Sequence, residues 1–577
     1  MPKVIIIGGG VAGLTSAHEL IERGFDVEVY EIKPQHLGGK ARSESVPATG
    51  PNFLPGEHGF RFFPGFYRHM THTLKRIPFG TGYCIDNLIP TDKIMFARVG
   101  LPPVIATARF PFSPSGLQLA FETITGGVAA TGLTSAEKQF FEEKVFQLFT
   151  SCKQRFDEEY ENIGWWQFME ADSQSATFKK LLVDGLTKTL VAAQARTMNT
   201  RIGGSIFLQL LYCLADPDYP PSRVLNGPTD DQWLIPWTTH LKAKGVKFFL
   251  NQEATALNLI GNNINSVAIT DHNTSTVNLI SGDQYLLALP VEKAKNLITV
   301  PIVTADQSLN GIHALAKDTR WMNGIQYYLN TDVRINKGHV IFIDSAWAIT
   351  AISQIQYWPS YPINTAFNGN VRGILSVDIS DWETTIFNGK LAKDCSDKEI
   401  AEWTYKQIQD SLLAELPSPA FDFNVVVEKY HIGSSIRRPV LGPLINDEPL
   451  LVNKNCTSNL IPKSFSSIQN LFLAGDYVKT HTGLACMETA NESARRAVNC
   501  IIDASGVHKP YAKVWKLREM PITYLCKWWD LRRYRRGLPY SSHYPWWFII
   551  LNFFWLILCT IRWVIVYLFH LVFGYTI

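Results

Sequence analysis

The chain has 577 residues, 46% of them hydrophobic and 18% charged, which is enough for a large buried core and two or three domains. Its net charge of +3 is unevenly placed, because residues 511–577 hold nine Lys and Arg against two acidic residues while the remaining 510 residues are slightly acidic. This distribution argues against a nucleic-acid partner and favours contact between the C-terminal region and an anionic membrane.

The N-terminus carries a glycine motif of the kind that binds dinucleotides. Residues 4–7 form a short apolar run, typical of a buried parallel strand, and Gly8, Gly10 and Gly13 follow it. The first glycine permits a tight turn, the second lets the backbone approach a pyrophosphate, and the third allows close helix packing. We therefore expect a dinucleotide site here.

The next elements complete this unit. Residues 14–23 have helical periodicity and end before a glycine, and residues 27–30 form a second strand that ends at Glu31. A carboxylate at this place accepts hydrogen bonds from a ribose without a 2′-phosphate. The motif alone leaves FAD and NAD as alternatives.

A glycine-rich, cationic stretch follows the second strand. It contains Gly38, Gly39, Lys40 and Arg42. Flexible glycines beside two cations suit closure around a pyrophosphate, although a basic surface loop would have the same composition.

A second motif lies more than 450 residues downstream. Residues 471–474 again form a short apolar run, followed by Gly475 and Asp476, and a helical pattern extends from Met487 through residue 502. The first amides of this predicted helix can face an electron-rich ligand.

These two motifs together resemble the FAD-dependent amine oxidase and phytoene desaturase superfamily. The resemblance implies that FAD is the cofactor, with the N-terminal glycines at its ADP half. Gly475 and Asp476 would contact the ribityl-pyrophosphate region, and the Met487 backbone the flavin pyrimidine edge. Lys40 and Arg42 would then lie near the pyrophosphate, and the backbone around Ala254 would contact adenine. No counterpart of a flavin-linking cysteine is recognisable, since Cys456 lacks the accompanying glycines, so we expect non-covalent FAD.

The fold that the resemblance implies is α/β, with a Rossmann-like FAD-binding domain, an inserted α+β substrate domain and a C-terminal apolar helical tail. The FAD-binding domain would comprise residues 1–90, 241–300 and 461–506. The substrate domain would comprise residues 91–240 and 301–460, and residues 507–577 would associate with a membrane.

Several stretches favour a lipid substrate over an amine. The segments GEHGFRFFPGFYRH, TRWMNGIQYYL and DSAWAITAISQIQYW are similar to carotenoid-desaturase-like and hydroxysqualene-dehydroxylase-like oxidoreductases. Amine oxidases of the superfamily usually place an aromatic residue where this chain has Cys486, and a lysine near flavin N5 where it has Gln326. Both departures weaken an amine oxidase interpretation.

Three ionisable residues in these segments are candidates for catalysis. His58, Arg61 and Asp344 could act as a base or stabilise charge when hydride and a proton leave neighbouring carbons. Structural roles explain them as well: His58 as a satisfied core histidine, and Asp344 as a helix cap.

The last segment is strongly apolar. Residues 546–561 carry no charge but number only 16, fewer than the roughly 20 residues that span a bilayer. Extending the segment to residue 577 places Arg562 near its centre, at about 3 kcal/mol on insertion scales. Asn552, Cys559 and His570 fall on one side of the expected helix. Both a spanning helix and an in-plane arrangement remain open, as does an interior or oligomer-interface helix.

The sequence therefore predicts a membrane-associated FAD oxidoreductase whose catalytic body is cytoplasmic, with four arginines before the apolar run on that side. Nine scattered cysteines, none spaced as CxxC, predict a reducing compartment and no metal site. We expect a desaturase or dehydrogenase of a hydrophobic substrate, such as an isoprenoid or a lipid acyl chain, with O2 or a quinone as electron acceptor. The alternatives are a tail-anchored flavin amine oxidase and a non-catalytic scaffold.

Overall fold

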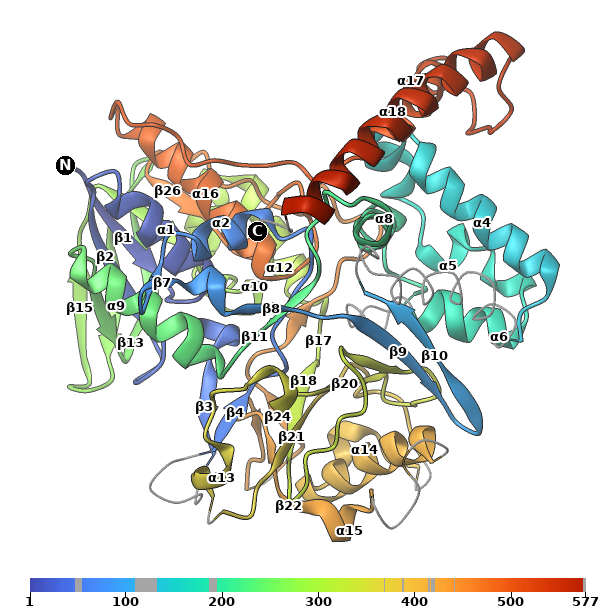
Figure 1. The fold of residues 1–577 in the computed structure, drawn as a ribbon. Helices are drawn as coiled ribbons and strands as arrows, with labels where there is room; N and C mark the ends of the chain where they lie inside the picture. Colours follow the sequence, from blue (N-terminus) through green and yellow to red (C-terminus); the bar gives the residue numbers. More distant parts are fainter. Residues whose placement is uncertain are drawn as a thin grey trace.

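A five-stranded parallel sheet forms one layer of the computed structural model (Figure 1). In spatial order its strands are β12 (Lys247–Leu250), β2 (Asp26–Glu31), β1 (Lys3–Ile7), β16 (Gln284–Leu287) and β26 (Leu471–Leu473). Residues 4–7 of the central strand β1 are a continuous, buried apolar run because both faces of a parallel sheet are covered. Three distant parts of the chain thus meet in one sheet.

The structure describes residues 1–46, 54–108, 132–185, 195–367, 369–386, 389–413, 416, 421–440 and 442–573.

Two helices cover one face of the parallel sheet. The helix α1 (Val11–Ile21) begins directly after the glycine turn, and α16 (Met487–Ala504) packs beside it. Their apolar sides share a core with Val4 and Ile6 of β1. On the opposite face lies an antiparallel meander of β13 (Gln252–Ile260), β14 (Asn263–Asp271) and β15 (Thr276–Ile280).

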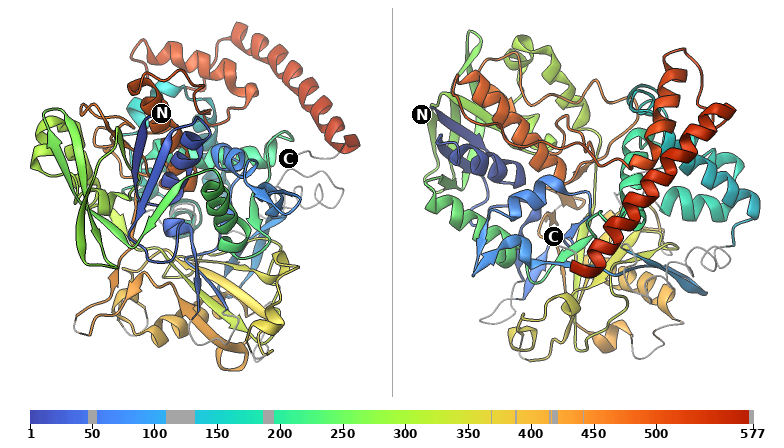
Figure 2. Two further views of the ribbon diagram at one scale, coloured as in Figure 1. Left: turned by 90° about the vertical axis from the view of Figure 1, so that its left-hand side faces the viewer. Right: turned by 45° about the horizontal axis from the view of Figure 1, so that its top comes forward.

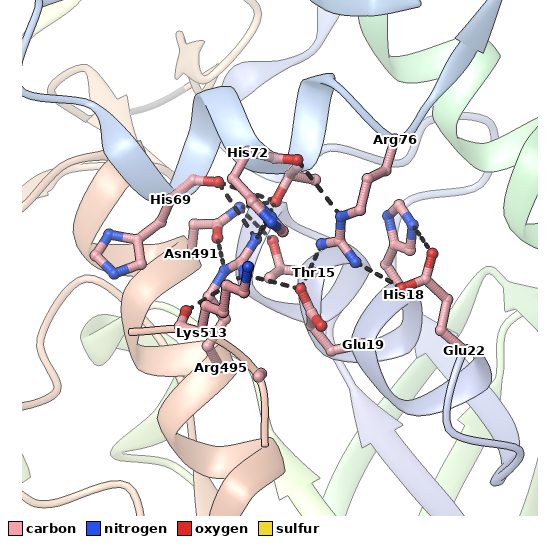
Figure 3. A network of polar contacts seen from close by, with 12 residues as sticks. Thr15, His18, Glu19, Glu22, His69, His72, Arg76, Asn491, Arg495 and Lys513 are labelled. Atoms are coloured by element: carbon pink, nitrogen blue, oxygen red, sulfur yellow. Dashed lines mark hydrogen bonds and ion pairs between the residues drawn. The ribbon is translucent and has the colours of Figure 1, made fainter. Parts of the chain in front are cut away.

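A buried polar network joins α1 and α16 to the short helix α2 (Arg68–Leu74) and the turn after it (Figure 3). Glu19 of α1 lies between two arginines, pairing with Arg76 and, at 3.0 Å, with Arg495 of α16. Burial alone would raise the pKa of Glu19, but the two arginines lower it by more than burial raises it. The pKa therefore lies below its ordinary value and the carboxylate is ionised. Asn491 of α16 donates to Thr15 Oγ1 at 2.9 Å. The network therefore ties α1, near the N-terminus, to α16, which lies more than 450 residues later in the chain.

A seven-stranded mixed sheet forms the second large layer, below the first in Figure 1. In spatial order its strands are β10 (Leu101–Thr107), β9 (Lys93–Arg98), β19 (Val340–Phe342), β20 (Ile349–Ser353), β21 (Gly373–Ile379), β18 (Asn323–Leu329) and β22 (Val427–Ile432). The helix α14 (Asp397–Leu412) covers its far face, where Tyr327 donates to the Ala401 carbonyl at 2.7 Å. The other face of this sheet is turned toward the parallel-sheet layer.

A third region is helical and lies to the right in Figure 1. It includes α4 (Ser135–Thr150), α5 (Trp165–Phe168) and α8 (Thr200–Ala215). A small sheet of β5 (Phe62–Phe63), β11 (Arg223–Leu225) and β8 (Leu88–Pro90) joins chain segments from before and after these helices.

The C-terminal region has two parts. Residues 507–545, including α17 (Tyr524–Tyr534), pack on the body: Trp515 N–H donates to His69 Nε2, and Asp530 pairs with Arg155 at 2.8 Å with both side chains buried. The long helix α18 (Trp546–Phe573) follows and exposes most of its apolar side chains (Figure 2). Within the described C-terminal region, the large exposed apolar surface therefore belongs to α18.

The predicted α/β fold class is confirmed, with a parallel sheet, additional α+β layers and an apolar C-terminal helix. The first helix begins three residues earlier than its periodicity predicted, since Gly10 has extended torsions and serves as the N-cap.

Candidate active site

A cavity of about 860 Å³ lies between the parallel sheet and the seven-stranded sheet. One end is lined by the N-terminal glycine turn and by β13, and the middle by the segment that precedes α16. The other end, which we call the inner end, is lined by residues 58–67, by α8 and by four strands or strand ends of the seven-stranded sheet. Its dimensions suit a large cofactor together with part of a substrate.

The glycine turn brings the backbone close to this cavity. Gly8 and Gly10 line it directly, whereas Gly13 lies behind them, where a Cβ would be 1.9 Å from the Gly8 carbonyl oxygen. The space in front of Gly10 is open, because a Cβ at this position would meet only the Cα of Gly39, at 3.8 Å. The turn therefore leaves a cradle at the start of α1 that a pyrophosphate fits.

The residues expected to bind the ADP half of the cofactor lie together at one end of the cavity. Glu31 lines the cavity and accepts the Gly9 N–H at 2.7 Å and the Lys33 N–H at 2.9 Å. Burial raises the pKa of Glu31, although these two amides oppose the rise. Ala254, on β13, lines the same end, as expected for a backbone contact with adenine.

The far motif lies in the middle of the cavity. Gly475, Asp476 and Met487 all line it. Met487 is the first residue of α16, and the preceding Cys486 provides no side-chain cap, so the first amides of this helix are available to a ligand. Asp476 accepts no hydrogen bond from the part of the chain that the structure describes.

The two cations expected near the pyrophosphate differ. Lys40 lines the cavity, where its ammonium pairs with Glu292 at 2.8 Å. Arg42 does not line it: the guanidinium donates to both carboxylate oxygens of Glu448, at 2.8 and 2.9 Å, and to Glu44 at 2.9 Å. It also donates to the Gly39 carbonyl at 2.9 Å. Arg42 thus holds the glycine loop in place from behind, and a position near the pyrophosphate stays a prediction for this residue.

His58 and Arg61 lie together at the inner end of the cavity. Burial lowers the pKa of His58 to about 4, so the ring is neutral, and its Nε2 has no hydrogen-bond partner among the described residues. Arg61 donates to the Lys40 carbonyl at 3.1 Å. Its Nε is 4.0 Å from the buried Glu57 carboxylate.

Asp378 is a cavity-lining residue that the sequence did not reveal. It lies on the interior strand β21 and is 7% exposed. No described residue donates a hydrogen bond to its carboxylate, and burial raises its pKa to about 7, against the effect of Arg61. Gly59 has φ +139°, and a Cβ there would be 2.3 Å from Asp378 Oδ1, so this glycine makes room for the carboxylate. The sequence LSVDIS is typical of an ordinary strand and gives no signal of this position.

A second residue that the sequence did not reveal is His339, immediately before β19. It is buried against the rings of Phe60 and Phe62, and burial lowers its pKa to about 4. Its Nδ1 has no partner within the described ranges. Phe66 and Leu210 add to an apolar lining, so the inner end combines aromatic walls with a few unsatisfied polar groups.

Asp344, the third residue considered for catalysis, lies outside the cavity. Its carboxylate accepts the Val99 N–H at 2.8 Å and pairs with Lys180 at 2.5 Å. Gln326 is also outside: it is fully buried, and its amide oxygen accepts the Glu57 N–H at 3.1 Å.

The cysteines and lysines of the cavity bear on the amine oxidase alternative. Cys486 lines the cavity in front of Met487, and Cys456 is exposed elsewhere. The lysines that line it within the described residues are Lys33, Lys40 and Lys293, which belong to the cofactor end. None of them comes from the seven-stranded sheet.

A protein-family model described as flavin containing amine oxidoreductase matches residues 11–502, most of the chain. The chain belongs to this family. The predicted superfamily is thereby confirmed, and the protein is an FAD-dependent oxidoreductase. The cradle at Gly10, the free amides of α16 and the size of the cavity fit FAD.

Sequence relatives include carotenoid enzymes and an amino-acid oxidase. Identity is 48% over 66 residues with the carotenoid phi-ring synthase of Chlorobaculum tepidum, covering 11% of this chain and 10% of that protein. It is 32% over 142 residues with the flavin-dependent L-tryptophan oxidase of Lentzea aerocolonigenes, covering 23% and 29%. It is 23% over 309 residues with the zeta-carotene desaturase of Synechocystis sp., covering 51% and 59%. The matched segments thus span between a tenth and about three fifths of these relatives.

Solved structures share the fold over nearly the whole chain. An oxidoreductase from Methanosarcina mazei has a TM-score of 0.55 at 12% identity, covering 87% of this chain and all of that one. Cyclohexylamine oxidase from Brevibacterium oxydans has a TM-score of 0.55 at 13% identity, covering 88% and 99%. At such identities the likeness establishes the fold alone.

Proposed function

We propose that the protein is a membrane-associated FAD-dependent desaturase or dehydrogenase of a water-insoluble substrate, an isoprenoid or a lipid acyl chain. The observation that carries the proposal is the inner end of the cavity. It is walled by Phe60, Phe62, Phe66 and Leu210, and it presents the carboxylate of Asp378, which has no hydrogen-bond donor among the residues that the structure describes. An apolar chain fits such walls, and a buried base suits removal of a proton from carbon.

Roles for the cofactor-binding residues follow from where they lie. Gly8, Gly10 and the start of α1 would hold the pyrophosphate, and Glu31 the ribose. The Met487 amide would face the flavin. Bound there, FAD supplies a two-electron acceptor for hydride.

The chain's own groups would handle the proton. Loss of hydride from one carbon leaves positive charge, and the Asp378 carboxylate would take a proton from the neighbouring carbon, which completes the double bond. Arg61 lowers the pKa of that carboxyl and so favours the ionised form that must act as base. The neutral rings of His58 and His339 would add hydrogen-bonding capacity without charge, and the aromatic walls would exclude water.

Membrane association is part of the proposal because the substrate would come from a bilayer. Within the described residues, one helix segment, Trp546–His570, is long and apolar enough to cross a membrane by length and composition. The catalytic body would then lie on the cytoplasmic side, and O2 or a quinone would reoxidise the flavin.

The test compares substrates under anaerobic conditions, with bleaching of the visible flavin absorbance as the measurement. We expect bleaching by a linear isoprenoid hydrocarbon or a saturated-chain phospholipid in detergent, with a product lighter by two hydrogens in mass spectrometry. Putrescine and tryptophan should leave the flavin oxidised, because Cys486 stands where amine oxidases of the superfamily have an aromatic residue, and the lysines that line the cavity within the described residues lie away from it, at the end with the glycine turn.

The variant Asp378→Asn should bind FAD normally and bleach at least tenfold more slowly, and Asp410→Asn on the surface of α14 serves as its matched control. Rapid bleaching by either amine would replace this proposal with the amine oxidase alternative. Wild-type protein that stays oxidised with every compound but bleaches with a chemical reductant would contradict both.

A further inference from the structure

The helix α18 has two chemically different sides. Large apolar side chains protrude on its outer side, where Phe553 is 59%, Leu558 60% and Ile565 62% exposed. On the other side, Phe548 is fully buried and packs against Trp529 of α17, at a ring distance of 5.4 Å. The helix is therefore apolar toward solvent and seated on the body with its opposite side.

The polar groups of α18 are turned toward the body. Trp555 Nε1 donates to the Pro521 carbonyl at 2.8 Å. Arg562 Nη2 lies 3.5 Å from Asp218 Oδ2, and His570 Nε2 lies 3.9 Å from Asp218 Oδ1. Asp218 stands just beyond the end of α8, so one carboxylate of the body is shared by the two basic residues of the helix. The positive charge of Arg562, which would make a spanning helix costly, is thus paired with a carboxylate of the protein's own body.

These contacts are spread along the length of α18. They begin at Phe548 and end at His570, a separation of about 33 Å at the helical rise of 1.5 Å per residue. The hydrocarbon core of a bilayer is about 30 Å thick. If α18 crossed it with these contacts intact, Asp218 and the polar backbone around it would lie in hydrocarbon, at several kcal/mol for each unsatisfied group. The right-hand view of Figure 2 shows α18 running beside α17 and past α8.

Basic residues stand at the start of this surface. Arg532, in the last turn of α17, and Arg535 and Arg536, just after it, are exposed, and none of them pairs with a carboxylate in the described ranges. Unpaired guanidinium groups beside an apolar helix face complement anionic lipid headgroups, which each basic residue near the surface attracts by about 1 kcal/mol.

We propose that α18 lies flat on one leaflet of an anionic bilayer, with its outer side at the acyl boundary and its Asp218-paired side on the protein, and that it does not span the membrane. This inference rests on the membrane association proposed above. It also gives α8 a position between membrane and cavity, because Ile206 and Leu210 of α8 line the cavity while the chain just past its end holds α18. A lipid substrate would then enter along α8.

The test locates the C-terminus relative to the membrane. Inverted membrane vesicles are prepared from bacterial cells that express the full chain with a protease-cleavable epitope after Ile577. We expect the protein in the vesicle fraction and complete loss of the epitope on adding protease without detergent. An epitope that is protected until detergent is added shows a spanning helix and overturns the inference, while membrane association stands. Protein found in the soluble fraction contradicts the association itself.

Two matched variants separate lipid from protein contacts. Phe553→Asp with Leu558→Asp places two carboxylates on the outer side of α18, whereas Val300→Asp with Val440→Asp places two at apolar sites of the body that are even more exposed. We expect the first pair to lower the membrane-bound fraction at least tenfold with unchanged FAD content, and the second pair to leave it unchanged. A stable dimer in detergent-free solution, dissociated by the first pair, would show that a second copy covers this face and would overturn the inference.

Discussion

Replacing Asp378 by asparagine tests whether ionisation of this buried carboxyl lowers the stability of the folded protein. The amide has nearly the same shape and cannot ionise. In the folded protein the pKa of Asp378 is about 7, because burial opposes ionisation, whereas its ordinary value is 3.8. The folded state therefore binds a proton at pH values where the unfolded chain has lost it, and the contribution of Asp378 to stability falls as pH rises.

The size of the effect follows from these two values. Stability from the protonated carboxyl is fully present below pH 4 and is lost between about pH 4 and 7, at about 1.4 kcal/mol per pH unit. At pH 8 the wild type has lost about 4 kcal/mol through this group, which the Asp378→Asn variant does not lose. The variant should thus become more stable than the wild type as pH increases.

The assay is denaturant unfolding of the FAD-loaded protein at several pH values between 5 and 8, followed by flavin and tryptophan fluorescence. Other ionisable groups contribute equally to both proteins and cancel in the difference. Asp410→Asn, which removes a surface carboxylate paired with Lys406, should give a difference near zero at every pH. A stability difference between Asp378→Asn and wild type that does not change with pH would refute the reasoning, because it would mean that Asp378 ionises normally.

Two further predictions concern the cofactor and the C-terminal region. Gly10→Val should fold but release its FAD on gel filtration, because Gly10 has φ −75° and open space in front of it, so the new side chain would occupy the pyrophosphate cradle; retained flavin would contradict this assignment. Truncation after Gly506 should yield insoluble or flavin-free protein, whereas truncation after Tyr544 should not, because only the first removes Asp530 and leaves Arg155 buried without its partner, at about 3–5 kcal/mol. Equal solubility and flavin content of the two truncations would show that residues 507–544 add nothing to the body.

The cofactor end of the cavity was predictable because its signals are local. Gly8, Gly10 and Glu31 occur in one strand–turn–helix–strand unit whose geometry follows from residue spacing. Asp476 and Met487 likewise lie in one short unit, between the strand β26 and the start of the helix α16. A buried strand, a glycine and a helix start are each readable within about twenty residues, and the parallel sheet brings the two units together.

The substrate end was not predictable, because its residues are made functional by distant neighbours. Asp378 stands in the sequence as one polar residue in an apolar strand, and its exposure to the cavity depends on Gly59, more than 300 positions earlier. Nothing in the sequence indicates that Arg42 pairs with Glu448, which follows it 406 positions later. Charge and residue type indicate what a side chain can do, and tertiary pairing determines which partner it meets.

The order of strands in the parallel sheet has a consequence for synthesis of the chain. β16 ends at Leu287, but its outer neighbour β26 begins only at Leu471. At about 5–20 residues per second, a ribosome needs roughly ten to forty seconds to make the intervening chain. Throughout that time the outer edge of β16 has no partner strand, and α16, which carries Arg495, has not yet been made and cannot pair with Glu19. The nascent protein should therefore depend on chaperones until its last hundred residues emerge, and flavin can assist folding only after that point.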